Sequence, residues 1–261
     1  MPNQSNQQPS KVELVQSIFS RIARYYDRMN DLISFQRHKA WRAFTMKQMA
    51  VFPGAQVLDV AAGTGDWTVA LAKAAGAEGR VVGLDFCREM LDVAKEKVSR
   101  EGVGRQTSLV LGDAMELPYS ENTFDFATIG FALRNVKDYR QVLREMTRVV
   151  KPGGLVVSLE LSKPTWEPFR TVYYFYFYKV MPFVARLLVG EGAPAYQYLP
   201  NSLTHFPGAE ELAQVFREVG LEEVRFWRFS GGVAALHIGR KPKGVASEAD
   251  AAPSRAADVE K

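Results

Sequence analysis

Short apolar runs alternate along the chain with longer segments in which apolar residues recur every three or four positions. The short runs predict buried strands at 55–60, 80–85, 107–111, 123–129 and 154–161. The longer segments predict helices at 66–75, 88–100, 137–150 and 209–219. Strands separated by helices indicate a parallel sheet with right-handed crossovers, so the fold class is α/β.

The same pattern divides the chain into parts. Residues 12–49 have helical periodicity, so 11–50 is predicted to form an N-terminal helical cap. Residues 51–241 then form the main domain, in which 163–208 interrupts the regular alternation as an insertion. Lys151-Pro152-Gly153-Gly154 is predicted to turn from a helix into a strand. Two last strands, 222–229 and 232–240, flank Ser230-Gly231-Gly232 and predict a hairpin; the polar ends 1–10 and 242–261 are expected to be disordered.

Glycine and aspartate follow three of the predicted strands. Gly63-Thr64-Gly65 follows the strand that contains Asp59, Asp85 ends the next strand, and Gly112-Asp113-Ala114 follows the third. In a parallel sheet these carboxyl ends share one edge, where glycine turns let a ligand approach the backbone and an acid binds ribose hydroxyls. The alternative is a domain whose turns only happen to be rich in Gly and Asp.

The details of this edge limit the ligand. The third glycine of the dinucleotide fingerprint is absent, since position 68 is Thr, and no phosphate-binding loop with Gly-Lys-Ser/Thr occurs. The acids Asp59, Asp66, Asp85 and Asp113 would repel a pyrophosphate but suit a ligand with hydroxyls, an ammonium and a sulfonium. S-adenosylmethionine has these groups, and the set resembles the motifs of class I methyltransferases.

Composition narrows the function classes further. The chain has 261 residues, 47% of them hydrophobic, and a net charge of +4, which is modest for a nucleic-acid-binding protein. Its single cysteine, Cys87, excludes a disulfide framework, and no His or carboxylate set has metal-ligand spacing, so no metal is expected.

Without a run of about 18 apolar residues or a signal-peptide pattern, the expected location is cytoplasmic. Residues 11–47 hold eight Lys and Arg against three acids, so this segment is either a solvated helix face or one that approaches an anionic membrane.

An unbroken aromatic run, Tyr173-Tyr174-Phe175-Tyr176-Phe177-Tyr178, lies in the insertion. A helix with aromatic residues on every side must be buried in a core or must face an apolar partner. The alternatives are a core helix, a lid or groove for a large apolar substrate, and a surface that enters the interface of a bilayer.

Two long motifs carry a family resemblance. Tyr26-Asp27-x-Met29-Asn30 with Ser34, His38 and Trp41 resembles the N-terminal signature of the menaquinone/ubiquinone biosynthesis C-methyltransferases. Arg148-Val-Val-Lys151-Pro152-Gly153-Gly154, continuing to Glu160-x-Ser162, resembles their second signature. Phe131-Ala-Leu133-Arg134-Asn135-Val136 and Thr204-His205-Phe206-Pro207-Gly208 resemble further family segments, and the resemblance covers about 12–241. Segments 33–38 and 204–208 are most similar to the demethylmenaquinone branch.

The resemblance implies a Rossmann-like sheet of seven mostly parallel strands with an antiparallel last strand, S-adenosylmethionine as cofactor, and methylation of a ring carbon of a polyprenylated demethylmenaquinol to menaquinol. The cofactor residues implied are the following: Tyr26, Asp59, Gly63, Thr64, Gly65, Asp85, Asp113 and Ala114. Asp27, beside Tyr26, is implied to cover the cofactor. Position 130 departs from the ubiquinone-type members, which have Ser where this chain has Gly130.

The implied reaction needs a group near the quinol oxygen, because a ring carbon becomes nucleophilic when the adjacent hydroxyl is ionised. Our hypothesis is that Arg134 stabilises the quinolate with Asn135 as its partner, and that His205 is the next candidate, as a base. Arg134 could instead form a salt bridge with an acid. A polyprenyl substrate implies peripheral contact with the inner face of the cell membrane.

Several alternatives stay open at this point. They are a polyprenyl benzoquinol of ubiquinone biosynthesis as substrate, a soluble phenol as substrate, and a cofactor-binding module without catalysis. A nucleic-acid methyltransferase is disfavoured, because Ile129-Gly-Phe131 stands where an Asn/Asp-Pro-Pro-aromatic motif would be, and the RNA type with two cysteines is excluded. The sequence leaves homodimerisation open.

Overall fold

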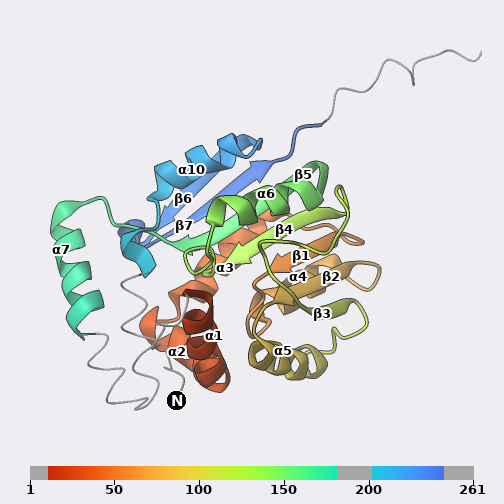
Figure 1. The fold of residues 1–261 in the computed structure, drawn as a ribbon, viewed down its shortest axis with the longest axis horizontal. Helices are drawn as coiled ribbons and strands as arrows, with labels where there is room; N and C mark the ends of the chain where they lie inside the picture. Colours follow the sequence, from red (N-terminus) through yellow and green to blue (C-terminus); the bar gives the residue numbers. More distant parts are fainter. Residues whose placement is uncertain (1–10, 181–201, 244–261) are drawn as a thin grey trace, which may run out of the picture.

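The computed structural model describes residues 11–180 and 202–243. A seven-stranded sheet runs through the molecule in the order β3-β2-β1-β4-β5-β7-β6 (Figure 1). The strands are β1 (Gln56–Val60), β2 (Arg80–Asp85), β3 (Thr107–Leu111), β4 (Phe124–Gly130), β5 (Val150–Leu161), β6 (Glu222–Phe229) and β7 (Ala234–Arg240). Only β7 runs antiparallel to its neighbours, β5 and β6, and this confirms the predicted fold class.

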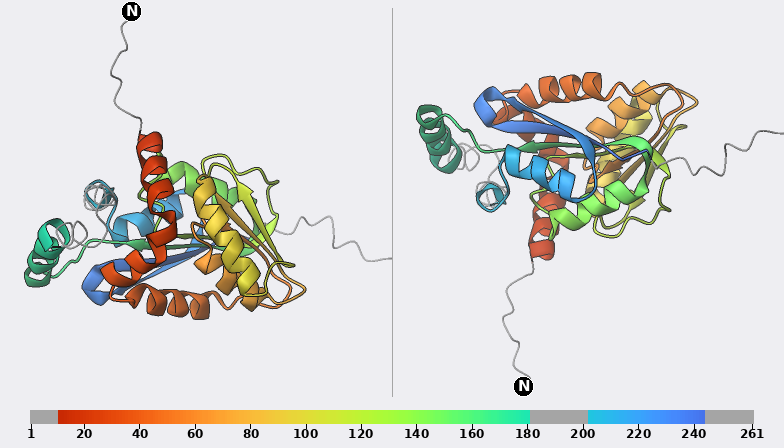
Figure 2. Two further views of the ribbon diagram at one scale, coloured as in Figure 1. Left: turned by 90° about the horizontal axis from the view of Figure 1, so that it is seen from below. Right: turned by 90° about the horizontal axis from the view of Figure 1, so that it is seen from above.

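Helices cover both faces of the sheet (Figure 2). They are α4 (Asp66–Ala75), α5 (Arg88–Arg100), α6 (Tyr139–Val149) and α10 (Ala209–Glu218), with α3 (Arg37–Met49) from the N-terminal cap. Side chains of α6 and α10 share one buried cluster with Leu58 and Leu84, while α3, α4 and α5 share the other with Val57 and Val81. Because neighbouring positions of β1 and β2 face opposite clusters, each strand is buried on both sides, as its unbroken apolar run predicts.

The N-terminal cap is a chain of short helices. It consists of α1 (Lys11–Ile22), the 3-10 helix η1 (Ala23–Tyr25), α2 (Tyr26–Ile33) and α3. Phe35 and Gln36 have positive φ angles, 49° and 58°, and so break the helical pattern between α2 and α3. The cap crosses the carboxyl ends of the strands, where the Lys11 ammonium donates to the carbonyl of Val136 at 2.7 Å.

One expectation about the elements was wrong and another is confirmed. The Lys151–Gly154 segment does not separate helix from strand, because β5 starts at Val150, directly after α6. The strand absorbs these residues as a register shift, since Phe124 pairs with Val150 and Phe126 with Leu155. The predicted hairpin at 230–232 is confirmed, with a single turn of 3-10 helix, η4 (Ser230–Gly232), between β6 and β7.

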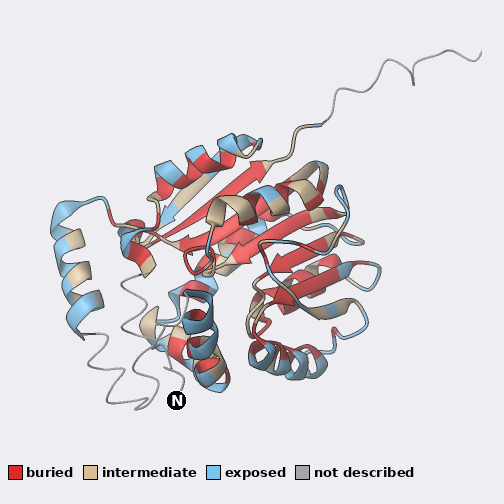
Figure 3. Ribbon diagram, viewed as in Figure 1, coloured by how far each residue is buried: buried red, intermediate tan, exposed pale blue. Residues whose placement is uncertain are grey.

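The aromatic insertion is not a core helix. The aromatic run lies in α7 (Glu167–Phe175) and in a π-helical turn, η2 (Tyr176–Val180), and α7 has no buried residue. The helix stands out from the body of the molecule and is coloured as exposed or intermediate along its length (Figure 3). Residues 1–10, 181–201 and 244–261 lie outside the described residues. The expected disorder of both chain ends therefore stays a prediction. No helix within the described ranges is both long and apolar enough to cross a membrane.

Candidate active site

A cavity of about 320 Å³ lies at the carboxyl ends of β1, β2 and β4, beneath the cap. Five of the eight residues predicted to bind the cofactor line this cavity: Tyr26, Gly63, Asp85, Asp113 and Ala114. Val12, Val15 and Phe19 of α1 line it from the other side. The strand-end pattern and the N-terminal signature, which are far apart in the sequence, therefore contribute to one cavity.

Asp85 is held rigidly by the backbone around it. One carboxylate oxygen accepts a hydrogen bond from the backbone N–H of Gly63 at 2.8 Å and the other accepts from Cys87 at 2.9 Å. Burial raises the pKa of Asp85, while these backbone bonds oppose the shift by favouring the ionised form. Each oxygen has a second lone pair, so the carboxylate can still accept from a pair of ligand hydroxyls.

The remaining three predicted cofactor residues support the turn instead of lining the large cavity. Thr64 donates its hydroxyl to Asp27 at 2.6 Å. Gly65 has a φ of 79°, and a Cβ there would lie 2.9 Å from the Cβ of Ala94, so the glycine lets α5 pack closely. The carboxylate of Asp59 accepts from Thr68 at 2.6 Å and from Thr128 at 3.0 Å, and its burial raises its pKa to about 6.

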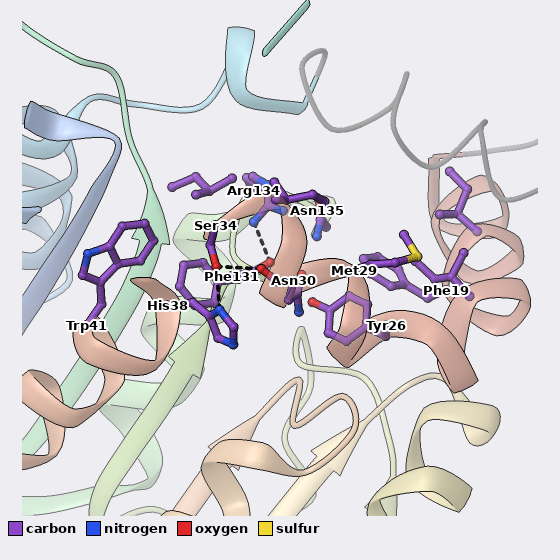
Figure 4. A pocket seen from close by; sticks show the side chains of 14 residues that line it. Phe19, Tyr26, Met29, Asn30, Ser34, His38, Trp41, Phe131, Arg134 and Asn135 are labelled. Atoms are coloured by element: carbon purple, nitrogen blue, oxygen red, sulfur yellow. Dashed lines mark hydrogen bonds between the residues drawn. The ribbon is translucent and has the colours of Figure 1, made fainter. Parts of the chain in front are cut away.

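A second, mainly apolar cavity of about 90 Å³ shares lining residues with the first, and Figure 4 shows the side chains that line it. Its apolar lining comes mostly from the cap and includes Ile18, Ile22, Met29, Ile33 and Trp41. Its polar lining is Tyr26, Asn30, Ser34, His38, Arg134 and Asn135. Phe19, Tyr26, Phe131 and Asn135 line both cavities, so ligands in the two would meet across these side chains.

Arg134 lies in the wall of the apolar cavity as a buried, paired cation. Its Nη1 donates to Glu160 at 2.5 Å and to the carbonyl of Phe131 at 2.5 Å, and both charged side chains are at most 5% exposed. Arg134 therefore does form a salt bridge with an acid, the alternative considered from the sequence, and this salt bridge is buried. The sequence did not identify Glu160 as the partner. Within the described chain the Nε of Arg134 and the Oδ1 of Asn135 have no hydrogen-bond partner. These two polar atoms are available to a ligand.

The two histidines of the motifs differ in their surroundings. His205 is exposed and lines neither cavity, so the structure does not bring this candidate base to the site. His38 is buried in the apolar cavity, where its Nδ1 lies 2.6 Å from the hydroxyl of Ser34. Burial and the nearby Arg42 lower the pKa of His38 and favour the neutral ring. The two residues lie on either side of the break between α2 and α3, so the turn at Phe35 and Gln36 brings them together.

Sequence reasoning missed a polar network beside the glycine turn. Lys97, which is 8% exposed, donates to Asp27 at 2.6 Å and also to Asp66. Asp66 in turn accepts from Arg42 of α3 at 3.1 Å. These alternating charges connect the cap to α4 and α5. No local sequence pattern predicts the pairs, because the paired residues are 24 to 70 positions apart.

Comparison with known proteins adds to this geometry. A model of the ubiE/COQ5 methyltransferase family matches residues 5–241. The chain belongs to this family. It is 53% identical over 236 residues to the demethylmenaquinone methyltransferase of Bacillus cereus and 52% identical to that of Bacillus anthracis, which in each case covers 90% of this chain and 99% of the relative.

Solved structures share the fold at low sequence identity. A SAM-dependent methyltransferase from Aquifex aeolicus aligns with a TM-score of 0.55 at 20% identity, over 76% of this chain and 88% of that one. The [4+2]-cyclase SpnF aligns with a TM-score of 0.61 at 19% identity, over 78% and 81%. Because one of these folds belongs to a cyclase, the likeness supports the architecture alone, and the reaction must be argued from the site.

Proposed function

We propose that this protein transfers a methyl group from S-adenosyl-L-methionine to a ring carbon of demethylmenaquinol, giving menaquinol. Membership of the family and relatives more than 50% identical support the reaction. The observation that carries it is the junction of two unlike cavities: one with acids at strand ends, the other apolar with Arg134 in its wall. A cofactor and an apolar ring can thus lie side by side, next to the side chains that line both cavities, Phe19, Tyr26, Phe131 and Asn135.

The larger cavity has the groups that the cofactor requires. Asp85 would hold the ribose hydroxyls, and Asp113 with Ala114 would lie beside the adenine. Asp113 is fixed for this, because it accepts from the backbone N–H of Met115 at 2.8 Å. When bound, S-adenosylmethionine supplies a methyl group made electrophilic by its sulfonium.

The smaller cavity would hold the quinol ring. Arg134, whose guanidinium is fixed by Glu160, would donate to the oxygen of the ring and stabilise it as an anion, with Asn135 as a second partner. The charge of the guanidinium is already balanced by Glu160. Arg134 would therefore stabilise the ring oxygen mainly through directed hydrogen bonds and less through its positive charge. Burial raises the pKa of Tyr26, so its hydroxyl stays protonated next to the ring. The apolar lining excludes water from the reacting carbon.

An exposed apolar surface beside this cavity would contact the membrane that contains a polyprenyl quinol. The apolar rim comprises Leu32, Phe35, Trp166, Val172 and Phe175, each 45–72% exposed. Phe35 lies 6.1 Å from Tyr176, measured between ring centroids, so η2, which directly follows α7, and the cap contribute to one surface. The exposed cations Arg37, Lys39 and Lys179 neighbour the rim in sequence and would attract anionic lipid headgroups.

The test is transfer of a radiolabelled methyl group from S-adenosylmethionine to demethylmenaquinone in detergent micelles, with the ring either reduced or oxidised. We expect labelled menaquinol only from the reduced ring, because the oxidised ring has no hydroxyl to ionise. Parallel reactions contain a polyprenyl benzoquinol and a soluble phenol. Faster transfer to either of these, or equal transfer to the oxidised ring, would contradict the proposal.

A further inference from the structure

A third cavity lies beside the large one, at the glycine turn. Tyr26, Ala61, Gly63, Gly130 and Phe131 line both, so the two cavities adjoin at the end of β1. The lining of this third cavity is mainly polar and includes Asp27, Asn30, Arg42, Asp59, Thr64 and Asp66. If the nucleoside end of a ligand is held at Asp85 and Asp113, the other end must leave along Gly63 into this polar cavity.

The two cations here differ in how many donors they have left. Lys97 directs its three N–H donors to Asp27, Asp66 and the hydroxyl of Thr64, so its ammonium is saturated. Arg42 makes one hydrogen bond within the described ranges, from Nη1 to Asp66. Its Nε is buried and has no partner in that part of the chain. Arg42 is therefore the cation that lines the cavity with donors to spare.

We propose that Arg42 of the cap binds the carboxylate of the methionine end of S-adenosylmethionine. This inference rests on the proposed function and assigns that cofactor's charged end to a residue of α3. A guanidinium offers parallel N–H donors that match a carboxylate, and Asp66 fixes its orientation through Nη1. The acids of the same cavity, Asp27 among them, provide the complementary environment for the ammonium of the ligand.

The arrangement has a consequence for recognition. Arg42 belongs to the cap, whereas Gly63 and Asp85 belong to the sheet, so an amino-acid carboxylate would join the cap to the sheet. A nucleoside that lacks this carboxylate gains nothing from Arg42. The cap should therefore distinguish a complete cofactor from its nucleoside fragment.

The experiment is isothermal titration calorimetry of the full chain with two probes, S-adenosylhomocysteine and 5′-methylthioadenosine, which lacks the amino-acid end. We compare the unmodified protein, Arg42→Met, Arg42→Lys, and the control Lys47→Met, which removes an exposed cation from the same helix. For Arg42→Met we expect the Kd of S-adenosylhomocysteine to rise roughly 10- to 100-fold, because a hydrogen-bonded charge pair is lost. The Kd of 5′-methylthioadenosine should change less than twofold, and Arg42→Lys should be intermediate.

Other outcomes overturn the inference in distinguishable ways. Equal weakening of both probes would mean that Arg42 only supports the cap, and no change in either would place the carboxylate elsewhere. If the unmodified protein binds neither probe, the proposed function fails and the inference fails with it. Should Arg42→Met not fold, Arg42→Lys decides alone, because loss of the planar fork must still weaken S-adenosylhomocysteine selectively.

Discussion

Asp59 is a carboxylate whose folded environment makes stability depend on pH. Its pKa is about 6 in the fold against 3.8 as a model value, so the folded protein holds its proton more tightly than the unfolded chain. The stabilisation is complete below about pH 4 and is lost as the pH rises through about 6. We predict that Asp59→Asn, whose amide can accept from one of the two threonine hydroxyls and donate to the other, gains stability relative to the unmodified protein as the pH rises from 4.5 to 7.5, by about 2 kcal/mol.

Urea unfolding at several pH values measures this difference. The control is Asp92→Asn, which neutralises an exposed acid on α5 and should change stability little at any pH. A difference between Asp59→Asn and the unmodified protein that stays constant across this range would show that Asp59 is already ionised in the fold at low pH.

At the scale of single residues, the sequence located the acids better than their partners. Asp85 and Asp113 could be placed because parallel strands end at one edge of the sheet, and both line the large cavity. The pairing of Arg134 with Glu160 spans 26 residues and depends on the register between β4 and β5, which no local pattern contains. His205 belongs to a family motif, but membership of a motif does not determine where a side chain lies. The residue is exposed and lines neither cavity, and its role as a base stays a prediction.

At the scale of elements, the contact between β4 and α4 accounts for Gly130. A Cβ at position 130 would lie 2.8 Å from a ring carbon of Trp67, the second residue of α4, so the indole occupies the space that a side chain would need. We predict that Gly130→Ser destabilises the protein by about 1–3 kcal/mol through overpacking. Trp67→Leu should relieve the clash. The double variant should therefore lose less unfolding free energy than the sum of the losses of the two single variants.

A double-mutant cycle by chemical denaturation measures this coupling. Gly104→Ser is the matched control, because a Cβ there meets nothing within 4 Å, and its effect should be within about 0.5 kcal/mol. Additive effects of Gly130→Ser and Trp67→Leu would mean that the indole moves aside at no cost. In that case Gly130 would need an explanation in the ligand and not in the packing.

Elements followed from the sequence wherever burial determined the pattern. Strands buried on both faces, such as β1 and β2, appear as unbroken apolar runs and were found to within one residue. The strand β5 was misjudged at its start, because proline and glycine signal a turn while the bulge that absorbs them depends on pairing with β4. The insertion was ambiguous for a similar reason: an aromatic helix has the same sequence whether a core or a membrane covers it.

At the scale of the whole molecule, the cap and α7 place the apolar rim next to the smaller, apolar cavity. Ile33 and Ser34 line that cavity, whereas their neighbours Leu32 and Phe35 are exposed on the rim, so a long apolar tail could pass directly from cavity to bilayer. Phe169 of α7 faces the body, since its ring lies 2.7 Å from where a Cβ at Gly231 would be. Trp166 and Phe175 are left 68% and 65% exposed.

We therefore predict that the protein binds vesicles containing anionic phospholipid and that Trp166→Ser with Phe175→Ser weakens this binding at least tenfold. Burial of each large apolar side chain contributes about 1.5–3 kcal/mol, so the loss of two outweighs the remaining electrostatic attraction.

Cosedimentation with vesicles measures the partition, and Phe52→Ser, which removes a 49% exposed aromatic outside the rim, should leave it unchanged. Equal partition of all three proteins would show that α7 does not enter the bilayer. Unchanged affinity of the double variant for S-adenosylhomocysteine separates loss of membrane contact from damage to the site, because Trp166 and Phe175 line none of the three cavities.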